Sequence, residues 1–401
     1  MNPLFQQMMT KASQLTQGGN LQAATEAIQR ALNPGRQEDA PATFAPPAVS
    51  RFPFARSAAR PAVAQRQRDS ADIVIDGCVR VLDDATATTS STATPPPVPS
   101  PAETTTAAPE RWTDGSFSHQ GRTLAYKLYV PPRAAGSTPA PRPLILMLHG
   151  CTQDPADFAA GTRMNELARR EGFVVLYPAQ TAHANSQKCW NWFKTQHQRR
   201  GSGEPALLAA LTRNVAEAEN VDGARIYAAG LSAGGAMADI LGQTYPDLFA
   251  AVGVHSGLPA GSATDLMTAL AAMRSGGSAS AVAATDPAVA AVPVIVFHGD
   301  ADSTVNVANG AAVAKAALAR AAGPAGRPAA RETTGTSPRG QGYVRTDYPR
   351  PDGGTAVELW TLHGAGHAWS GGSASGSYTD ARGVDASSEM LRFFLSHPMR
   401  P

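Results

Sequence analysis

A single serine occupies the stretch with the smallest side chains in the middle of the chain. Residues 228–238 read AAGLSAGGAMA, which places Ser232 between Gly230 and Gly234. A sharp turn from a strand into a helix needs such neighbours, because the two elements approach closely there and the apex residue has a strained backbone. The pattern predicts a nucleophile elbow with Ser232 as the nucleophile. The alternative is a tight packing turn with an incidental serine.

A serine nucleophile needs a base, and the base needs an acidic residue that orients it. When the serine stands on an elbow of this kind, the acid and then the histidine follow it along the chain. Two stretches satisfy this order, HGDADSTVN at residues 298–306 and HGAGHAWSGG at residues 363–372. Both follow apolar runs, so each predicts a loop at the end of a strand.

Each of these two loops offers two candidates. We favour Asp302 as the acid, because Val305 can anchor the turn behind it, and we expect Asp300 to cap its turn or bond to its backbone. We favour His367 as the base, because its Gly-Ala-Gly-His loop can swing an imidazole over the sheet edge. We expect His363, close to the strand end, to be a packed histidine. Activity should then rise with pH as the imidazole loses its proton.

An oxyanion in this chemistry needs two N–H donors. One is expected from Ala233, directly after the nucleophile, and the other from the loop LMLHGCTQ at residues 146–153, where Cys151 follows a histidine and a glycine. The alternative that Cys151 is itself the nucleophile is weaker, because the serine interpretation explains three loops at once.

The spacing of the remaining histidines and the cysteines shows no metal-ligand pattern, so we expect no metal and no cofactor. We expect a structural role for three histidines, His149, His255 and His298, and a surface position for four others, His119, His183, His197 and His397.

Short apolar runs alternate with helical patterns from about residue 111 onward. The apolar runs are 143–150, 173–180, 225–230, 250–257, 292–299 and 357–364, and the helical patterns cover 158–170, 205–219, a segment from Ala233, 264–274, 308–321 and 385–396. Ahead of them, alternation around Gln120 and Gly121 predicts a β-hairpin. This α/β pattern predicts a mostly parallel sheet with helices on both faces, and reactive groups just beyond the carboxyl ends of its strands.

Three segments with different compositions divide the chain. Residues 1–34 show two short amphipathic helical patterns broken by glycines, which predict an N-terminal helical hairpin. Residues 35–110 are rich in Pro, Ala and Thr and predict a disordered linker, in which 72–82 could add one strand. Residues 111–401 form the predicted catalytic domain. The hairpin could dock on that domain, self-associate or bind a partner, and the sequence leaves these possibilities open.

The composition excludes several classes of function. A formal net charge of +2 on 401 residues gives no electrostatic reason to expect a nucleic-acid partner. No apolar run reaches the roughly 20 residues of a membrane span. The N-terminus lacks the basic start and unbroken apolar stretch of a secretory signal, which favours the cytoplasm.

Five motifs in the same order resemble the polyhydroxybutyrate (PHB) depolymerase family of esterases, relatives of bacterial feruloyl and acetylxylan esterases. They are HGCTQ, CWNWF (189–193), GLSAGGAM, HGDAD and GAGHAWSGG, and the resemblance covers about residues 112–397. It implies an α/β-hydrolase fold, a Ser232–Asp302–His367 triad and an oxyanion hole from Cys151 and Ala233. The implied substrates are short hydroxyalkanoate esters or polyesters, with no cofactor.

The same resemblance places an aromatic loop, with Trp190, Trp192 and Phe193, beside the cleft. These side chains either hold substrate or form the packed core of the loop, and both possibilities stay open. The two cysteine-bearing motifs also suggest a disulfide between Cys151 and Cys189, which would pin the aromatic loop to the oxyanion loop.

Two rival functions remain at this point. One is a carbohydrate esterase that releases acetyl or feruloyl groups, since the triad and oxyanion hole would be shared. The other is an interaction protein that binds a polymer granule or another protein through its N-terminal segments, with hydrolysis secondary. The resembled family also suggests export, as an alternative to the cytoplasm.

Overall fold

The computed structural model describes residues 108–133, 140–278, 291–321, 329–350 and 353–399. The predicted hairpin at 1–34, its possible partner and nearly all of the predicted linker at 35–110, including the strand at 72–82, lie outside the described residues. They therefore stay predictions.

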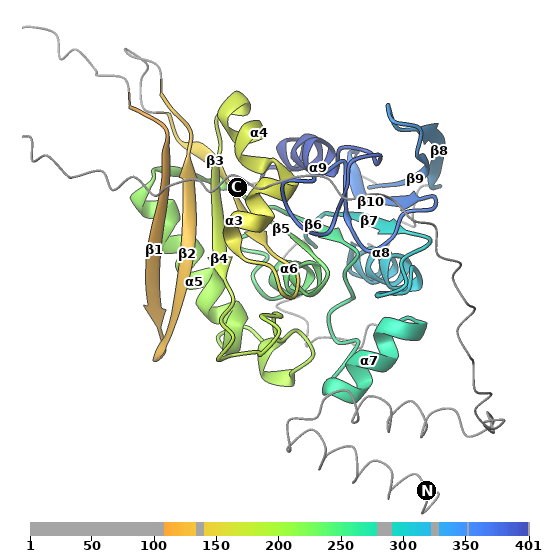
Figure 1. The fold of residues 1–401 in the computed structure, drawn as a ribbon, viewed down its shortest axis with the longest axis horizontal. Coiled ribbons are helices and arrows are strands. Elements are labelled where there is room, and N and C mark those ends of the chain that lie inside the picture. Colours follow the sequence, from red (N-terminus) through yellow and green to blue (C-terminus); the bar gives the residue numbers. More distant parts are fainter. Residues whose placement is uncertain (1–107, 134–139, 279–290, 322–328, 351–352, 400–401) are drawn as a thin grey trace, which may run out of the picture. The chain divides into compact units, whose positions relative to one another are not determined.

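A ten-stranded sheet runs through the described part of the chain (Figure 1). Its strand order is β1-β2-β4-β3-β5-β6-β7-β10-β9-β8, and β11 and β12 form a separate pair. The strands are β1 (Arg111–His119), β2 (Arg122–Val130), β3 (Arg142–Leu148), β4 (Val174–Ala179), β5 (Val221–Leu231), β6 (Ala251–His255), β7 (Val294–Gly299), β8 (Arg331–Thr336), β9 (Gly342–Pro349), β10 (Thr355–Leu362), β11 (Trp369–Ser370) and β12 (Thr379–Asp380).

The six central strands, from β4 to β10 in spatial order, pair in parallel. The antiparallel hairpin β1–β2 extends one edge, and the antiparallel strands β9 and β8 extend the other. The predicted mostly parallel sheet and the β-hairpin are confirmed. The turn between β1 and β2 consists of Gln120 and Gly121, both with positive φ, as a tight two-residue hairpin requires. Strands β8 and β9 were not predicted.

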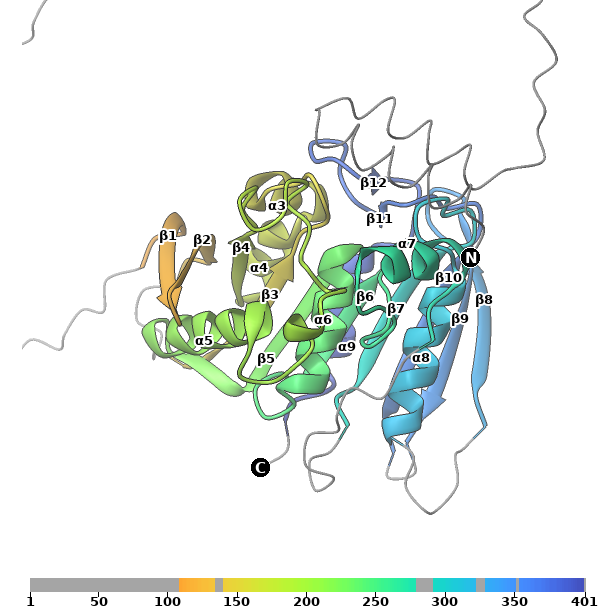
Figure 2. The ribbon, with the colours of Figure 1, turned by 90° about the horizontal axis from the view of Figure 1, so that it is seen from below.

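Helices cover both faces of the sheet, as predicted (Figure 2). One face carries α5 (Gly203–Ala218), α6 (Ala233–Thr244) and α8 (Ala308–Ala321), and the other carries α3 (Pro155–Thr162), α4 (Met164–Glu171) and α9 (Ala386–Leu395). The remaining helical elements are α7 (Leu266–Ser275) and a short 3-10 turn, η1 (Thr195–His197).

Strand β3 shows why two covered faces produce an unbroken apolar run. Leu144, Leu146 and Leu148 pack into the core beneath α5, α6 and α8, whereas Ile145 and Met147 pack into the core on the opposite face. Successive strand side chains point to opposite faces, so both sets must be apolar when helices cover both.

The helix predicted over 158–170 is two helices. Arg163, with φ of 56°, ends α3 and precedes α4, because its left-handed backbone cannot continue a right-handed helix. The Asp154 side chain accepts hydrogen bonds from the N–H groups of Ala156 and Asp157 and caps α3.

The loops that carry the candidate catalytic residues follow neighbouring strands, at the end of the sheet where the parallel strands have their carboxyl termini. Ser232 follows β5, Asp302 follows β7 and His367 follows β10, and the order β5-β6-β7-β10 makes these strands near neighbours. Parallel strands have their carboxyl ends on the same side of the sheet, so the three loops lie on that side.

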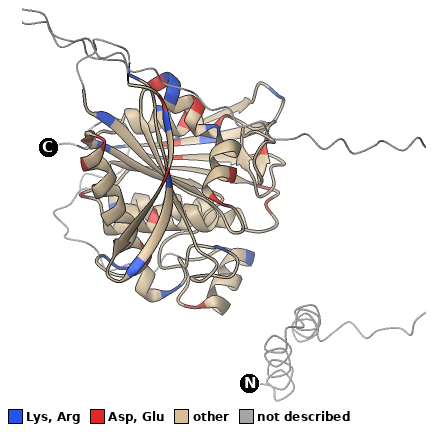
Figure 3. Cartoon of the chain, turned by 60° about the vertical axis from the view of Figure 1, so that its left-hand side comes forward, with Lys and Arg blue, Asp and Glu red and all other residues tan. Residues whose placement is uncertain are grey.

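Positions of Lys and Arg alternate with positions of Asp and Glu along the described elements rather than forming separate stretches of one sign (Figure 3). Within the described ranges, no helix combines the length and the apolar character that crossing a membrane requires.

Candidate active site

Ser232 occupies a strained turn between β5 and α6. Its backbone has φ of 58° and ψ of −120°, a combination that residues other than glycine rarely adopt. Its N–H donates to the carbonyl of His255 at 2.9 Å, and its carbonyl accepts from the N–H of Ala236 at 2.9 Å. The side chain makes no capping hydrogen bond to α6, so backbone hydrogen bonds alone hold this turn to its neighbours.

Glycines around Ser232 allow the strand and the helix to touch. A Cβ on Gly230 would lie 2.4 Å from the backbone of Gly234, and a Cβ on Gly234 would lie 2.0 Å from the carbonyl oxygen of Leu148 and 2.6 Å from that of His149. Real Cβ atoms do not approach backbone this closely, and backbone cannot swing away as a flexible side chain can. Both positions therefore require glycine.

We expect Gly234→Ala to destabilise the protein by more than about 3 kcal/mol, because the added methyl group would displace the oxyanion loop or the elbow. Urea unfolding measures the effect. Gly223→Ala is the matched control, since a Cβ at Gly223 meets nothing within 4 Å. Equal stability of the two variants would contradict the close approach at Gly234.

Asp302 and His367 form a buried hydrogen-bonded pair. The Nδ1 of His367 lies 2.7 Å from Oδ2 of Asp302, and the two side chains are 12% and 0% exposed. The other oxygen, Oδ1, accepts from the N–H groups of Thr304 and Val305 at 2.9 and 2.8 Å. Burial by itself raises the pKa of Asp302, but the hydrogen bond and charge of His367 and these two N–H donors outweigh it, so the pKa is lowered. Asp302 is thus held ionised, able to orient the imidazole.

His255 connects the serine turn to the histidine loop. Its carbonyl accepts from Ser232, and its Nε2 accepts from the N–H of Ser370, at 3.0 Å, three residues beyond His367. Its ring stacks on Phe297 and Trp369. Burial, together with the nearby charges of other histidines, lowers the pKa of His255 to about 3. His255 is neutral and structural, as predicted, and His149 and His298 are buried as well.

A second aspartate–histidine pair lies next to the first and is exposed. His363 Nδ1 is 2.9 Å from Oδ2 of Asp300, and Oδ1 of Asp300 accepts from the N–H of Gly364 at 2.7 Å. This N–H belongs to the loop after β10, 64 residues away, whereas the prediction placed the backbone bond of Asp300 within its own turn. The packed position predicted for His363 is wrong: its side chain is 51% exposed, because β10 ends at Leu362 and the chain has left the sheet.

The loop after β3 is held from both sides. His149 contacts the carbonyl oxygen of Gly150 through Nδ1 and the N–H of Gln180 through Nε2, at 2.7 and 3.1 Å. The indole N–H of Trp190 donates to the carbonyl of His149 at 3.1 Å. A Cβ on Gly150 would lie 3.7 Å from Cβ of Ser232, so this loop runs directly beside the serine. The N–H of Ala233, in the first turn of α6, has no acceptor within its own helix.

Comparison with known proteins matches residues 124–339 to the family described as esterase PHB depolymerase. This range is more than half of the 401 residues and includes Ser232 and Asp302. The chain belongs to the esterase PHB depolymerase family. The resemblance that the motifs suggested is confirmed.

Two curated proteins similar to this chain are named for different esterase activities. Poly(3-hydroxyalkanoate) depolymerase C of Paucimonas lemoignei is 32% identical over 237 residues, which are 57% of this chain and 55% of that protein. Feruloyl esterase B of Neurospora crassa is 32% identical over 131 residues, 32% of this chain and 42% of that protein. The chain thus spans about half the length of these relatives.

The fold also matches a solved structure. Acetyl xylan esterase from Aspergillus awamori superposes with a TM-score of 0.53 at 18% identity, covering 70% of this chain and 98% of that one. At this identity the match concerns the fold alone, and it confirms the predicted α/β-hydrolase fold.

In this family member, Cys151 and Cys189 form the predicted disulfide, across a separation of 38 residues. The bridge ties the loop after β3 to the aromatic loop, and the N–H of Thr152 adds a second link by donating to the carbonyl of Gln187 at 2.6 Å.

We expect Cys189→Ser to lower the free energy of unfolding by about 4 kcal/mol, because a 38-residue loop then regains its freedom in the unfolded chain. Thermal melting with and without reductant measures the effect. Cys78→Ser is the control and should melt like the parent protein. A melting temperature of the parent that reductant leaves unchanged would argue against the bridge.

The aromatic loop is mostly core. Trp190 is fully buried and Trp192 is 5% exposed, whereas Phe193 is only partly buried and meets Trp192 edge-on at 5.7 Å. Burial supports the packed-loop interpretation for both tryptophans. Phe193 is the member of the three with surface to offer a substrate.

The sequence analysis missed a buried carboxylate, Glu204, at the start of α5. Its Oε1 accepts from the side-chain amides of Gln180 and Asn191 at 2.7 and 2.6 Å, and its Oε2 accepts from the Asn191 N–H at 2.7 Å. Burial raises the pKa of Glu204 despite these donors. Glu204 thereby holds the loop that carries Trp190. No sequence signal distinguished it, since a glutamate in the first turn of a helix is ordinarily exposed.

Two histidines expected at the surface, His197 and His397, are buried, so that prediction was wrong. His197 Nδ1 accepts from the N–H of Glu204 at 2.9 Å, and His397 lies between the carbonyls of Phe393 and Thr355. Hydrogen bonds with backbone groups made the burial favourable: the partner of His197 lies seven residues away, and those of His397 lie four and 42 residues away.

Stability should fall on mild acidification because of His197. Burial lowers its pKa to about 4, with the charges of Arg122 and Lys194 adding to the effect. An unfolded histidine has a pKa of about 6.5. The stabilisation is therefore complete above about pH 6.5 and is lost as the pH falls through about 4, up to about 3 kcal/mol.

Urea unfolding between pH 7 and pH 4 tests this prediction. In His197→Asn the amide oxygen can replace the Nδ1 acceptor without titrating in this range. The stability difference between parent and variant should shrink as the pH falls, and a constant difference would count against a neutral buried His197.

Proposed function

We propose that this chain is a serine esterase that hydrolyses carboxylic esters by acyl transfer. Ser232 is the nucleophile, His367 the general base and Asp302 the residue that orients the imidazole. The observation that carries the proposal is the 2.7 Å hydrogen bond between buried Asp302 and His367, on the sheet edge where Ser232 has its strained turn.

The reaction uses only groups of the chain and water. Neutral His367 takes the proton of the Ser232 hydroxyl as the oxygen attacks the ester carbonyl, and the N–H groups of Cys151 and Ala233 receive the oxyanion. His367 then protonates the leaving alcohol, and water repeats the attack on the acyl-enzyme.

We expect the hydrogen bond between Ser232 and His367 to form in the reacting complex. Within the described ranges the Ser232 hydroxyl makes no hydrogen bond, and such catalytic bonds often tighten only when substrate is present. The buried Asp302–His367 pair and the held serine backbone leave little else to rearrange.

Short hydroxyalkanoate oligomers or polyesters are the substrates that the comparisons favour. Membership of the esterase PHB depolymerase family and the 32% identity to a poly(3-hydroxyalkanoate) depolymerase support this choice. The second candidate is a carbohydrate esterase acting on feruloyl or acetyl groups. Feruloyl esterase B supports it, since its sequence identity to this chain is also 32%, although over a shorter stretch.

A substrate panel separates these candidates. The purified full chain is given a 3-hydroxybutyrate trimer, methyl ferulate and acetylated xylan at equal ester concentration. We expect kcat/KM to be highest for the trimer. Preference for methyl ferulate or xylan would establish the second candidate, and hydrolysis of none of the three would contradict the esterase proposal.

A further inference from the structure

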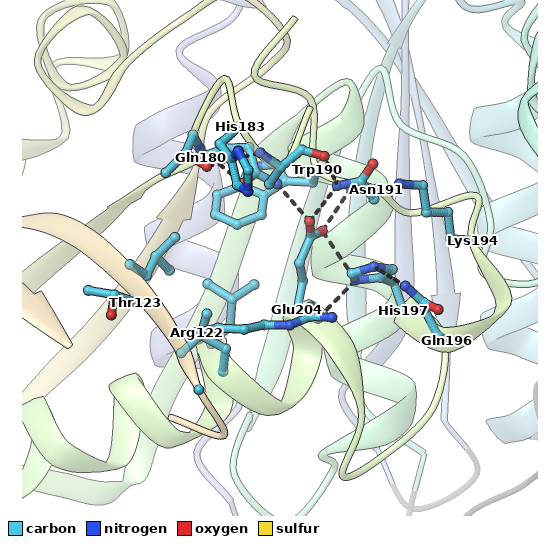
Figure 4. Close-up of a pocket in the computed structure, with 16 residues that line it drawn as sticks. Arg122, Thr123, Gln180, His183, Trp190, Asn191, Lys194, Gln196, His197 and Glu204 are labelled. Atoms are coloured by element: carbon cyan, nitrogen blue, oxygen red, sulfur yellow. Dashed lines mark hydrogen bonds and ion pairs between the residues drawn. The ribbon is translucent and has the colours of Figure 1, made fainter. Parts of the chain in front are cut away.

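A cavity of about 430 Å³ lies beside the aromatic loop (Figure 4), and Ser232, Asp302 and His367 are not among the residues that line it. Its walls come from the start of β2, the segment after β4 and the start of α5. Its volume falls within the roughly 300–1,000 Å³ of small-molecule sites.

Two cations, Arg122 and Lys194, line this cavity. Arg122 and Lys194 both face it, and neither side chain forms a hydrogen bond or an ion pair with any residue that the structure describes. Lys194 Nζ lies 6.0 Å from the centre of the Phe193 ring. Arginine and lysine without counter-ions at a concave site are what an anionic ligand needs.

The charge of Arg122 acts on the interior of the cavity. It lowers the pKa of buried Glu204, opposing the rise due to burial, and it adds to the fall that burial causes in the pKa of His197. These two groups are neighbours in the cavity wall, with Nδ1 of His197 3.6 Å from Oε2 of Glu204 (Figure 4).

Glu204 is the one carboxylate among the residues that line the cavity. Among the described residues, it forms no hydrogen bond or ion pair with Arg122 or Lys194. Its oxygens accept three hydrogen bonds from Gln180 and Asn191. The cationic groups therefore stay available to a ligand.

The cavity is mechanically joined to the oxyanion loop. Trp190 forms part of its wall and donates to the carbonyl of His149, and the neighbouring Cys189 is bonded to Cys151. Trp190 therefore contacts both the cavity and the loop after β3.

We propose that this cavity is a carboxylate subsite, in which Arg122 and Lys194 bind the free acid end of a short hydroxyalkanoate. The inference rests on the proposed function, because every such oligomer, and every product of its hydrolysis, carries one carboxylate. The site would favour short free acids over internal or capped ester units.

Kinetics with a matched pair of substrates test the proposal. The 3-hydroxybutyrate trimer as free acid is compared with its methyl ester, which differs only in the charged end. We expect the parent KM for the free acid to be about tenfold lower, as one charge-assisted contact provides. In the double variant Arg122→Gln with Lys194→Gln, the free-acid KM should rise to that of the methyl ester with kcat unchanged.

Arg331→Gln is the control, because Arg331 is an exposed arginine on β8 at the opposite edge of the sheet. The double variant and the control should not differ towards the methyl ester. Equal KM values for acid and methyl ester in the parent, or a double variant that changes both substrates alike, would overturn the proposal. So would loss of thermal stability without any change in the ratio of KM values, which would make Arg122 only a counter-ion of Glu204.

Calorimetry on Ser232→Ala separates this proposal from the proposed function. Binding of 3-hydroxybutyrate itself, absent for its methyl ester and lost in the double variant, supports the subsite even if the trimer proves not to be a substrate. Tighter binding of the trimer acid than of the monomer assigns the site to substrate ends, and equal binding assigns it to released product. No binding of either acid would overturn the subsite.

Discussion

Ser232→Ala is expected to lower kcat for p-nitrophenyl butyrate by about 10⁵-fold or more, since a lost nucleophile leaves only binding and the oxyanion donors. The fold should persist, because the backbone N–H and carbonyl of Ser232 make its hydrogen bonds and its side chain makes none to α6. Initial rates with active-site titration, and thermal melting of the same samples, measure the two effects.

Ser116→Ala, at an exposed position on β1, is the control and should retain the parent rate. Wild-type turnover by Ser232→Ala would remove the nucleophile assignment, and with it the mechanism proposed for the whole site.

Asp302→Asn is expected to lower kcat by about 10⁴-fold, because the amide cannot hold the histidine in the tautomer that accepts the serine proton. Asp300→Asn is the matched control. It alters the neighbouring aspartate–histidine pair, which is exposed, and should change kcat by less than about threefold because a solvated pair contributes little. If the two variants lost activity equally, the assignment of the acid to Asp302 would be wrong.

The same substitution has an expected signature in stability. The folded state lowers the pKa of Asp302 below that of an unfolded aspartate, about 3.9. Its ionised form therefore stabilises the fold above about pH 4, and this contribution is lost as the pH falls through the lowered value. In urea unfolding, the stability difference between parent and Asp302→Asn should therefore be larger at pH 7 than at pH 3.

Most of the sheet could be predicted because its strands are covered on both faces. An unbroken apolar run such as that of β3 satisfies two cores at once and is easily recognised. The exposed edge strand β8 has no such run, since most of its residues face solvent, and it went unpredicted. Likewise, the break at Arg163 depends on one left-handed residue inside an otherwise helical pattern.

Local chemistry accounts for the parts of the candidate site that were predicted. Strain at Ser232 and the close backbone contacts at Gly230 and Gly234 are properties of a few consecutive residues. The glycines that these contacts require are visible in the sequence at fixed spacing, so the turn could be predicted. The order of serine, acid and histidine along the chain follows from the order of the strands.

Long-range contacts account for what the residue pattern left open. Asp302 and Asp300 stand two positions apart in similar loops, and only the packing shows that one pairs with a buried histidine and the other with an exposed one, 65 and 63 residues away. The burial of His197 and Glu204 depends in the same way on partners from several elements. Such contacts leave no mark at a single position, because each requires two distant segments that become neighbours only when the chain folds.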